Sequence, residues 1–405
     1  MSLPCILFVE PEAAVLQGLM RQVNDVLEEC QIVLSMNYEA ALEVLSQRVC
    51  SVVIASCGTR VTEGEAFLSK VQARHPAVVR YAFLPGDDEE GQRCLSLAHA
   101  SQCFTVNCPP GELATAIQCG LDIWRRCHGK PELQKLLMQL DNIPTPPTLY
   151  FDLREEMQSR DCDNARISGL LSRDPALCAR VLKLANSCFY ALPRTVSDVN
   201  EALMYLGTDV LLSLVLATHV FNHMPVPGIS LDALWHHSLA SSLLSRQICS
   251  QLGADPQQVN AAATAGLLHD MGQLILLSNM PERYYPLVHR SGGDESLLLK
   301  LEQEEIGVGH PELCAHVLAL WSLPEMIVDA VASHHLPMAF TSAGCSPVSS
   351  AVGIAEWLMQ ESFSRENTTG EAWEMPCMPH CTQAQIDEWK ASCSKLLAND
   401  LQRIA

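Results

Sequence analysis

The sequence lacks an excess of basic residues: 26 Lys and Arg stand against 46 Asp and Glu, which gives the 405-residue chain a formal net charge of -20. Nucleic-acid affinity depends largely on Lys and Arg that neutralise phosphates, so we expect no direct binding to nucleic acid. The sequence also lacks a basic, apolar leader and any uncharged apolar run of ~18 residues, the length of a membrane helix. These absences predict a cytoplasmic protein that does not enter a membrane.

A regular cysteine framework is missing as well. The 18 cysteines are scattered, and several lie in helical-looking segments, such as Cys178 and Cys249, which is typical of reduced thiols used as small core residues. The compact cluster of Cys377, His380 and Cys381 lacks a second ligand pair at the spacing of a zinc finger. We interpret this cluster as a surface loop.

The first part of the chain alternates short apolar runs with helical patterns. The runs CILFVE, SVVIAS, VVRYAFLPG and CFTVNCPP are separated by segments with apolar residues at helical spacing. A β/α alternation predicts a parallel sheet with helices on both faces. Any site is then expected at the carboxyl ends of the strands.

Residues 3–126 resemble a response-regulator receiver, on the motifs VEPEAAVLQGL and SVVIASCGTRVTEGEAFL. In that family an acidic pair binds Mg²⁺, an Asp accepts phosphate, and a Ser or Thr and a Lys follow. The matching positions of this sequence hold Glu10, Glu12, Ser56, Pro85 and Cys108.

The receiver-like segment is expected to be degenerate. An aspartyl phosphate needs a carboxylate nucleophile with a hard cation beside it, and Ser56 and Cys108 supply neither the nucleophile nor the charge. We therefore interpret the segment as a pseudo-receiver that serves docking or dimerisation. The alternative, phosphorylation of Ser56 by a different route, stays open.

The alternation ends at the prolines of NIPTPPTLY, and the remainder shows helical spacing. In RDPALCARVLKLANS, for example, Asp174 is placed as an N-cap and Pro175 as the first helical residue. We predict a flavodoxin-like α/β domain followed by an all-α domain. The predicted limits are a receiver-like domain at 1–128, a linker at 129–147, a helical domain at 148–345, and a C-terminal helical extension at 346–405 that packs on it. The apolar stripe of residues 383–404 is interpreted as a packing face, with a partner-binding helix as the alternative.

Residues 138–340 closely resemble the HDOD family. The resemblance runs from IPTPPTLYFDL through LLSRDPALCARVLKLANSCFYALPRTVSDVNEALMYLG to WHHSLASSLLSRQI and AAATAGLLHDMGQLIL. It implies the fold of the HD superfamily of metal-dependent phosphohydrolases. It also implies a role in bacterial signal transduction, since HDOD domains are generally regarded as regulatory output modules.

Histidines and acids stand at the HD-type motif positions of this segment. HD chemistry needs such side chains to converge from several helices on a divalent metal ion. The residues at the motif positions are His237, His269, Asp270, His310, His334, His335 and Glu356. We expect them to line one cleft, with Glu356 at its rim, where a divalent transition metal could bind. The alternative is that His237 and His269 are core residues and that His334 and His335 lie on a solvated helix end.

The sequence thus predicts a signal-transduction regulator, in which a pseudo-receiver is joined to a non-catalytic HDOD output module. This module would bind signalling proteins, or a nucleotide or cyclic dinucleotide at the histidine cleft. Gln273 stands where a Lys often follows the HD motif, so a charged phosphate contact is lost. The alternative is a metal-dependent phosphohydrolase that acts on a nucleotide or cyclic dinucleotide. A homodimer is also left open.

Overall fold

The structure is a computed structural model. It describes residues 3–22, 30–57, 61–84, 100–105, 108, 111–140, 143–158, 163–186, 194–224, 231–336, 346–364 and 381–404. The chain divides into two compact units, one of residues 1–146 with 316–323 and one of residues 147–315 with 324–405. The domain limits proposed from the sequence stay predictions.

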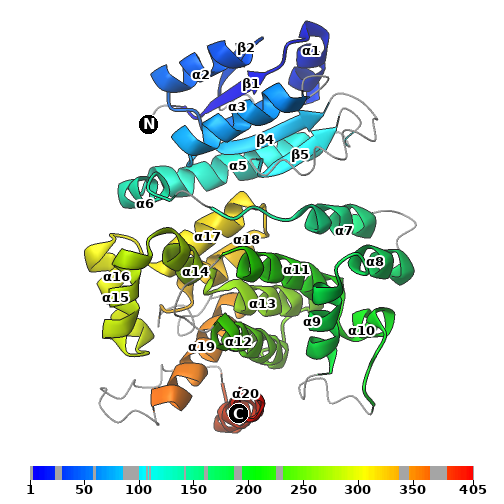
Figure 1. The fold of residues 1–405 in the computed structure, drawn as a ribbon, viewed down its shortest axis with the longest axis vertical. Coiled ribbons are helices and arrows are strands. Elements are labelled where there is room, and N and C mark those ends of the chain that lie inside the picture. The colour runs from blue at the N-terminus through cyan, green and yellow to red at the C-terminus, as the bar shows by residue number, and fades with distance from the viewer. Residues whose placement is uncertain are drawn as a thin grey trace. The chain divides into compact units, whose positions relative to one another are not determined.

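The first unit is built on a five-stranded parallel sheet with the order β2-β1-β3-β4-β5 (Figure 1). Its strands are β1 (Cys5–Val9), β2 (Gln31–Ser35), β3 (Val52–Ser56), β4 (Val79–Leu84) and β5 (Gln102–Thr105). Its helices are α1 (Ala13–Gln22), α2 (Tyr38–Gln47), α3 (Val61–Arg74), α5 (Glu112–His128) and α6 (Pro131–Leu137). This strand order is that of flavodoxin-like receivers, so the predicted fold class is confirmed for this unit.

The sheet buries both of its faces, which explains why its strands are continuous apolar runs. Leu7 and Val53 belong to one core, which also holds Phe67 of α3 and the buried residues of α2. On the other face, Tyr81 of β4 donates a hydrogen bond to the carbonyl oxygen of Ala116 in α5 at 2.6 Å. Helices therefore cover both sides of the sheet, as the alternating pattern predicted.

Strand β2 was not expected from the sequence. It lies at the edge of the sheet and pairs only with β1, with Gln31 opposite Cys5. Its residues QIVLS are mostly half-buried or exposed, and Leu34 keeps 49% of its surface exposed. An edge strand of this kind has no long apolar run, so the sequence pattern that reveals the central strands is missing.

The second unit is helical, which confirms the predicted all-α class (Figure 1). Its first helices are α7 (Thr148–Gln158), α8 (Asn164–Leu171), α9 (Pro175–Ala185), α10 (Val199–Leu206), α11 (Thr208–His223), α12 (Leu231–Gln251) and α13 (Pro256–Leu268). The later helices are α14 (Met271–Asn279), α15 (Pro281–Ser291), α16 (Glu295–Glu305), α17 (His310–Leu320), α18 (Glu325–Ser333), α19 (Pro347–Ser364) and α20 (Gln383–Ile404). Of α17, only residues 310–315 belong to this unit.

Local signals in the sequence set several helix starts. Asp174 caps α9 by accepting a hydrogen bond from the backbone N–H of Leu177 at 3.0 Å, and Pro175 is the first helical residue, as predicted. Asp255 and Gln258 form a reciprocal capping box at the start of α13. The N-termini of these helices therefore follow from short-range chemistry.

Helices α12 and α13 pack closely against each other at the centre of this unit. A Cβ added to Gly266 of α13 would lie 2.8 Å from the carbonyl oxygen of Ser241 in α12, so only glycine allows this approach. Helix α19 packs on both of them. These three helices form the frame that carries several of the motif residues.

Helix α20 packs on α12 and α19. Its Trp389 is completely buried and donates a hydrogen bond from Nε1 to Oε1 of Gln251 at the end of α12, at 2.5 Å. Ile386 is buried on the same helix. The apolar stripe of α20 is therefore a packing face, and the alternative of a partner-binding helix is not needed to explain it.

Among the described residues, no single helix has both the length and the apolar composition to cross a membrane. The bent pair Val199–Leu206 and Val210–Phe221 reaches that length and composition only when its two helices are taken together. The predicted cytoplasmic location stays a prediction.

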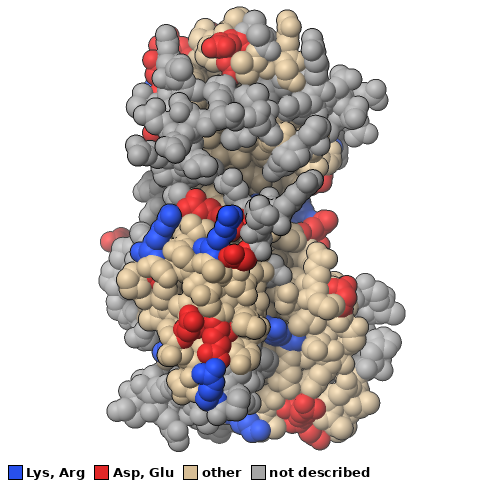
Figure 2. All heavy atoms as spheres, turned by 90° about the vertical axis from the view of Figure 1, so that its right-hand side faces the viewer, with Lys and Arg blue, Asp and Glu red and all other residues tan. Residues whose placement is uncertain are grey.

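One face of the molecule shows how its basic side chains are distributed. Figure 2 shows a face on which Lys and Arg occur as a few separate groups with acidic side chains between them. Within the described part of that face, they form no continuous basic surface. The prediction that the chain does not bind nucleic acid directly is not tested further by the structure.

Candidate metal centre

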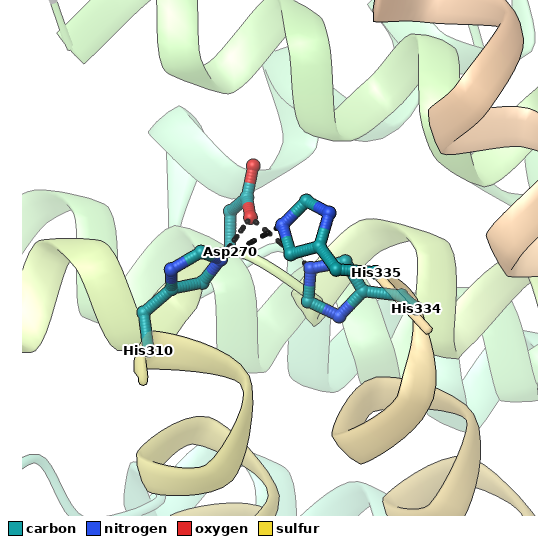
Figure 3. Close-up of side chains that lie close together, drawn as sticks. All are labelled: Asp270, His310, His334 and His335. Carbon is teal, nitrogen blue, oxygen red and sulfur yellow. Dashed lines mark hydrogen bonds and ion pairs between the residues drawn. The ribbon is translucent and has the colours of Figure 1, made fainter. Parts of the chain in front are cut away.

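The seven predicted ligand residues come together in the helical unit. They are brought there by five segments: α12 carries His237, the break between α13 and α14 carries His269 and Asp270, α17 begins at His310, His334 and His335 follow α18, and α19 carries Glu356. In Figure 3, Asp270 points between the rings of His310, His334 and His335. Their convergence is what the sequence predicted; their role as ligands stays a prediction.

Asp270 occupies a helix break that the adjacent residues of the HD motif require. Helix α13 ends at Leu268, His269 is its C-cap, and Asp270 has φ -94° and ψ 6° before α14 begins at Met271. In a continuous helix two adjacent side chains would project about 100° apart. The break lets both side chains turn to the same place, with His269 Nε2 and Asp270 Oδ2 3.0 Å apart.

The two carboxylate oxygens of Asp270 face different histidines. Oδ2 lies 3.0 Å from Nε2 of His269 and 3.3 Å from Nε2 of His237. Oδ1 lies 3.5 Å from Nε2 of His310 and 3.7 Å from Nε2 of His334. One carboxylate therefore stands between two sets of imidazoles.

These contacts define two sets of potential ligands that share Asp270. The four-residue group consists of Asp270, His310, His334 and His335, and the three-residue group consists of His237, His269 and Asp270. Within each group the ligand atoms lie within 4.8 Å of one another. This spacing is suited to one ion in each group, with the carboxylate of Asp270 available to both.

Glu356 extends the three-residue group, and its observed place differs from the predicted one. Its Oε2 lies 3.3 Å from Nε2 of His237 and 3.3 Å from Nε2 of His269, and the residue is only 2% exposed. The prediction that Glu356 lies at the rim of a cleft is wrong. The longer side chain of Glu reaches into the cluster from α19, because α19 packs directly on α12 and α13.

The most accessible of the seven side chains is His237, which is 18% exposed. His334 and His335 are buried, at 1% and 8% exposure. The alternative that placed these two on a solvated helix end is therefore wrong. The polar side chains of the cluster are enclosed by helices instead.

A glycine permits this enclosure. A Cβ added to Gly272 would lie 2.1 Å from the carbonyl oxygen of His310, which no real Cβ contact allows. The start of α14 and the start of α17 can touch only because this position has no side chain. His310 forms this contact, and Asp270 lies two residues before Gly272. The contact therefore holds Asp270 and His310 close to each other.

Electrostatics in the three-residue group is dominated by the two acids. Burial lowers the pKa of a histidine, but Glu356 and Asp270 outweigh it and hold the pKa of His237 well above its ordinary value. The same two acids raise the pKa of His269 to about 9 against the effect of burial. Burial by itself would raise the pKa values of Asp270 and Glu356. The neighbouring histidines outweigh burial and hold both pKa values well below their ordinary range.

The pKa values of the adjacent His334 and His335 are shifted in the opposite direction. Burial and the neighbouring His335 hold the pKa of His334 well below its ordinary value, and burial and His310 lower the pKa of His335 to about 4. Both rings are therefore neutral at pH 7. A neutral imidazole is the form that binds a metal ion.

Three buried polar atoms of the cluster make no hydrogen bond to any described residue. They are Oδ1 of Asp270, Nε2 of His334 and Oε2 of Glu356. These atoms have only the ion-pair contacts at 3.3 to 3.7 Å described above, so they keep hydrogen-bonding capacity that a bound ion could use. Imidazole nitrogens and carboxylate oxygens are together the ligands that divalent transition metals prefer. The residues present therefore fit a divalent transition metal ion.

Three residues around the cluster, Tyr284, Glu295 and Glu302, were missed by sequence reasoning, and one of them contacts Gln273, which the sequence had already marked. Gln273 donates a hydrogen bond from Nε2 to Oε2 of Glu295 at 3.1 Å, and this carboxylate lies 4.0 Å from Nε2 of His335. Burial and Asp270 raise the pKa of Glu295 to about 8. Glu302 and Tyr284 lie on the other side of His310. No spacing in the sequence marks these residues, because they reach the cluster from α15 and α16 through tertiary packing.

The receiver-like site keeps its place in the fold but little of its chemistry. Glu10 follows β1 and Ser56 ends β3, two neighbouring strands at the point where the strand order reverses. Oε1 of Glu10 accepts a hydrogen bond from the backbone N–H of Glu12 at 2.8 Å, and the side chain of Glu12 is exposed. Cys108 is partly buried, and Pro85 lies outside the described residues. Cys377 and His380 of the predicted surface loop are likewise outside them.

Comparison with known proteins agrees with this division. Residues 143–337 match the family model of the HDOD domain. Residues 143–337 are therefore similar to the HDOD domain, and they follow an α/β unit with the receiver-like strand order.

Three relatives illustrate the match. An uncharacterized protein of Treponema pallidum (strain Nichols) is 25% identical over 197 residues, which are 49% of this chain and 38% of that protein. A Marinobacter aquaeolei structure named for signal transduction has a TM-score of 0.51 at 17% identity and covers 69% of this chain and 65% of its own. A Geobacter sulfurreducens HDOD domain protein of unknown function has a TM-score of 0.49 at 23% identity and covers 65% of this chain and 97% of its own. The Marinobacter likeness shows a shared fold.

Proposed function

We propose that this chain is a signal-transduction regulator whose HDOD domain binds divalent transition metal ions and serves as a non-catalytic output module. The observation that carries the proposal is the position of Asp270 between two ligand groups, with one oxygen facing each. Ions bound there would supply Lewis-acid positions for a phosphate group of a ligand. A nucleotide or cyclic dinucleotide is the class of ligand that such a centre suits, and signalling proteins are the proposed partners.

The surroundings of the cluster favour binding over turnover. Among the described residues, no Lys or Arg forms an ion pair with any of the seven. Gln273, at the position where a Lys often stands, uses its amide to hydrogen bond Glu295. Hydrolysis of a phosphate ester needs stabilisation of the developing negative charge, and neither Gln273 nor Glu295 adds positive charge to that of the bound ions.

The test is a metal analysis of the purified full chain combined with a hydrolysis screen. We expect about two divalent ions per chain by elemental mass spectrometry. His335→Ala should remove the ion of the four-residue group, and His237→Ala should remove the ion of the three-residue group. With bis(4-nitrophenyl) phosphate, nucleotides and cyclic dinucleotides, turnover should be absent or slight. A wild-type chain that binds no ion from Mn²⁺, Fe²⁺, Co²⁺ or Zn²⁺ would contradict the proposal.

A second candidate, a metal-dependent phosphohydrolase, is favoured by the same shared carboxylate. Two-metal sites in phosphatases and nucleases act on phosphate esters, and Asp270 is placed to serve two ions. Rapid metal-dependent hydrolysis of any of these substrates by the wild-type chain, lost in His269→Ala, would make this candidate correct. The same result would refute only the non-catalytic part of the first proposal.

A further inference from the structure

The ring of His310 contacts a buried carboxylate on its Nδ1 side. Glu302 of α16 is fully buried, and both of its oxygens lie 2.9 Å from Nδ1 of His310. Oε2 also accepts a hydrogen bond from the backbone N–H of His310 at 2.8 Å, where α17 begins. Oε1 accepts one from the hydroxyl of Tyr284 at 2.5 Å. One side chain thus fixes both the ring and the backbone of His310.

These hydrogen bonds decide which nitrogen of His310 faces the other ligands. Both oxygens of Glu302 act as acceptors, Oε2 for the backbone N–H of His310 and Oε1 for the hydroxyl of Tyr284, as a carboxylate does. A carboxylate only accepts hydrogen bonds, so Nδ1 of His310 must carry a proton. When the ring loses a proton to bind a metal ion, the lone pair is therefore on Nε2. That atom lies 3.5 Å from Oδ1 of Asp270 and 3.2 Å from Nε2 of His335.

Two other histidines of the cluster are oriented in the same way, but by the backbone. Nδ1 of His269 lies 2.8 Å from the carbonyl oxygen of Gly266, and Nδ1 of His334 lies 2.6 Å from the carbonyl oxygen of Val331. A carbonyl oxygen also only accepts, so these rings too direct Nε2 to the centre. Of these three orienting groups, only Glu302 is a side chain that substitution can change.

We infer that Glu302 is a positioning residue that sets the tautomer and direction of His310 and so tunes metal binding in the four-residue group. The inference rests on the proposed metal-binding function. Hydrogen-bond partners of this kind fix the ring of a ligating histidine and raise its basicity, and their loss costs roughly 10–100-fold in metal affinity. The three-residue group does not contain His310, so its ion should be unaffected.

The test is a titration of the full chain with Co²⁺, followed by visible absorption, for the wild type and Glu302→Gln. Gln has one acceptor oxygen in place of two and no charge, so it holds Nδ1–H of His310 more weakly and raises the basicity of the ring less than the carboxylate does. We expect one Co²⁺ to bind as in the wild type and the other roughly 10–100-fold more weakly, with a changed spectrum. In Zn²⁺-loaded, ¹⁵N-histidine-labelled wild-type protein, the Nδ1–H signal of His310 is identified by its absence in His310→Gln. In Glu302→Gln this signal should shift and exchange faster with solvent, because the hydrogen bond that holds the proton is weaker.

Glu305→Gln is the matched control, since Glu305 lies on the same helix with its side chain 47% exposed and paired with Arg290. It should bind both ions as the wild type does. If Glu302→Gln does not fold, judged by circular dichroism, Glu302→Asp takes its place, because it keeps the charge and withdraws the oxygens by one methylene. Equal affinities and spectra in the folded variant and the wild type would overturn the inference. Absence of Co²⁺ binding in the wild type would instead contradict the proposed function.

Discussion

The receiver-like site and the histidine cluster differ in how many of the side chains expected at their motif positions they retain. At the carboxyl ends of β1 and β3, the fold still brings two polar positions together, but they hold Glu10 and Ser56, and Glu10 is engaged by its own loop. In the segment that matches the HDOD model, the seven predicted ligand positions hold histidines and acids, which are metal-binding residue types, and all seven converge. Topology therefore preserves the location of a site independently of its chemistry. Chemistry has to be judged residue by residue.

The largest expected effect on the histidine cluster, and so on its contrast with the receiver-like site, is that of removing Asp270. Asp270→Ala deletes the one carboxylate shared by both ligand groups, so we expect both ions to be lost from the purified chain. In metal-free protein it also removes one of the two carboxylates that face the buried, protonated His237 and His269, a change that costs up to roughly 3–5 kcal/mol in the free energy of unfolding. Elemental analysis and urea unfolding measure the two effects.

The control for this substitution is Asp387→Ala, which removes an exposed carboxylate from α20. It should leave metal content and stability as in the wild type. Retention of two ions by Asp270→Ala would show that the two groups do not depend on a shared carboxylate.

The next largest effect is expected from Gly272→Ala. The added Cβ would meet the carbonyl oxygen of His310, so α14 and α17 must move apart. We expect a loss of roughly 1–3 kcal/mol in the free energy of unfolding, measured with urea, together with weaker metal binding. Gly169→Ala is the matched control, because nothing lies within 4 Å of its Cβ position in α8. There the same change should be neutral or stabilising by up to ~1 kcal/mol.

The charge state of the cluster predicts two opposite responses to pH. The pKa of His269 is about 9 in the folded protein against an ordinary value of 6.5, so the folded state holds a proton that the unfolded state releases between these values. The stabilisation is present below pH 6.5 and is lost as the pH rises through 9. Glu295, with a pKa of about 8, acts in the same direction between pH 4.5 and 8.

Metal binding should respond in the other direction. His269 must release its proton to bind an ion, so metal affinity should rise between pH 6.5 and 9 while the stability of metal-free protein falls. Urea unfolding with a chelator and Zn²⁺ titrations in the same buffers measure both trends. Parallel trends would mean that the protons of the cluster and the metal do not compete for the same atoms.

The smallest effect is expected in the receiver-like domain. Acetyl phosphate or beryllofluoride with Mg²⁺ should leave it unchanged, because Ser56 is not a carboxylate nucleophile and Cys108 carries no positive charge at the position of the family's Lys. Intact mass spectrometry measures any phosphate added. A phosphorylated species that disappears in Ser56→Ala would show that this site is chemically active, and would remove the contrast with the HDOD domain.

Much of the fold could be predicted from short-range features. The central strands are continuous apolar runs because both faces of the sheet are buried, and the caps at Asp174 and Asp255 mark their helices by local hydrogen bonds. The edge strand β2 lacked such a run and was missed. The seven motif residues of the HDOD segment could be named in advance because each lies within a short, recognisable motif.

The sequence by itself determined which side chains are available to the site and which chemistry the receiver-like domain has lost, since both depend on residue identity at single positions. Only the tertiary structure decided that the oxygens of Asp270 divide between two groups, that Glu356 lies inside the cluster, and that Glu302 holds His310. These relations arise where separate helices approach one another, at contacts such as that of Gly272 with His310. Such approaches depend on how whole helices pack, and packing of this kind leaves no periodic pattern along the chain.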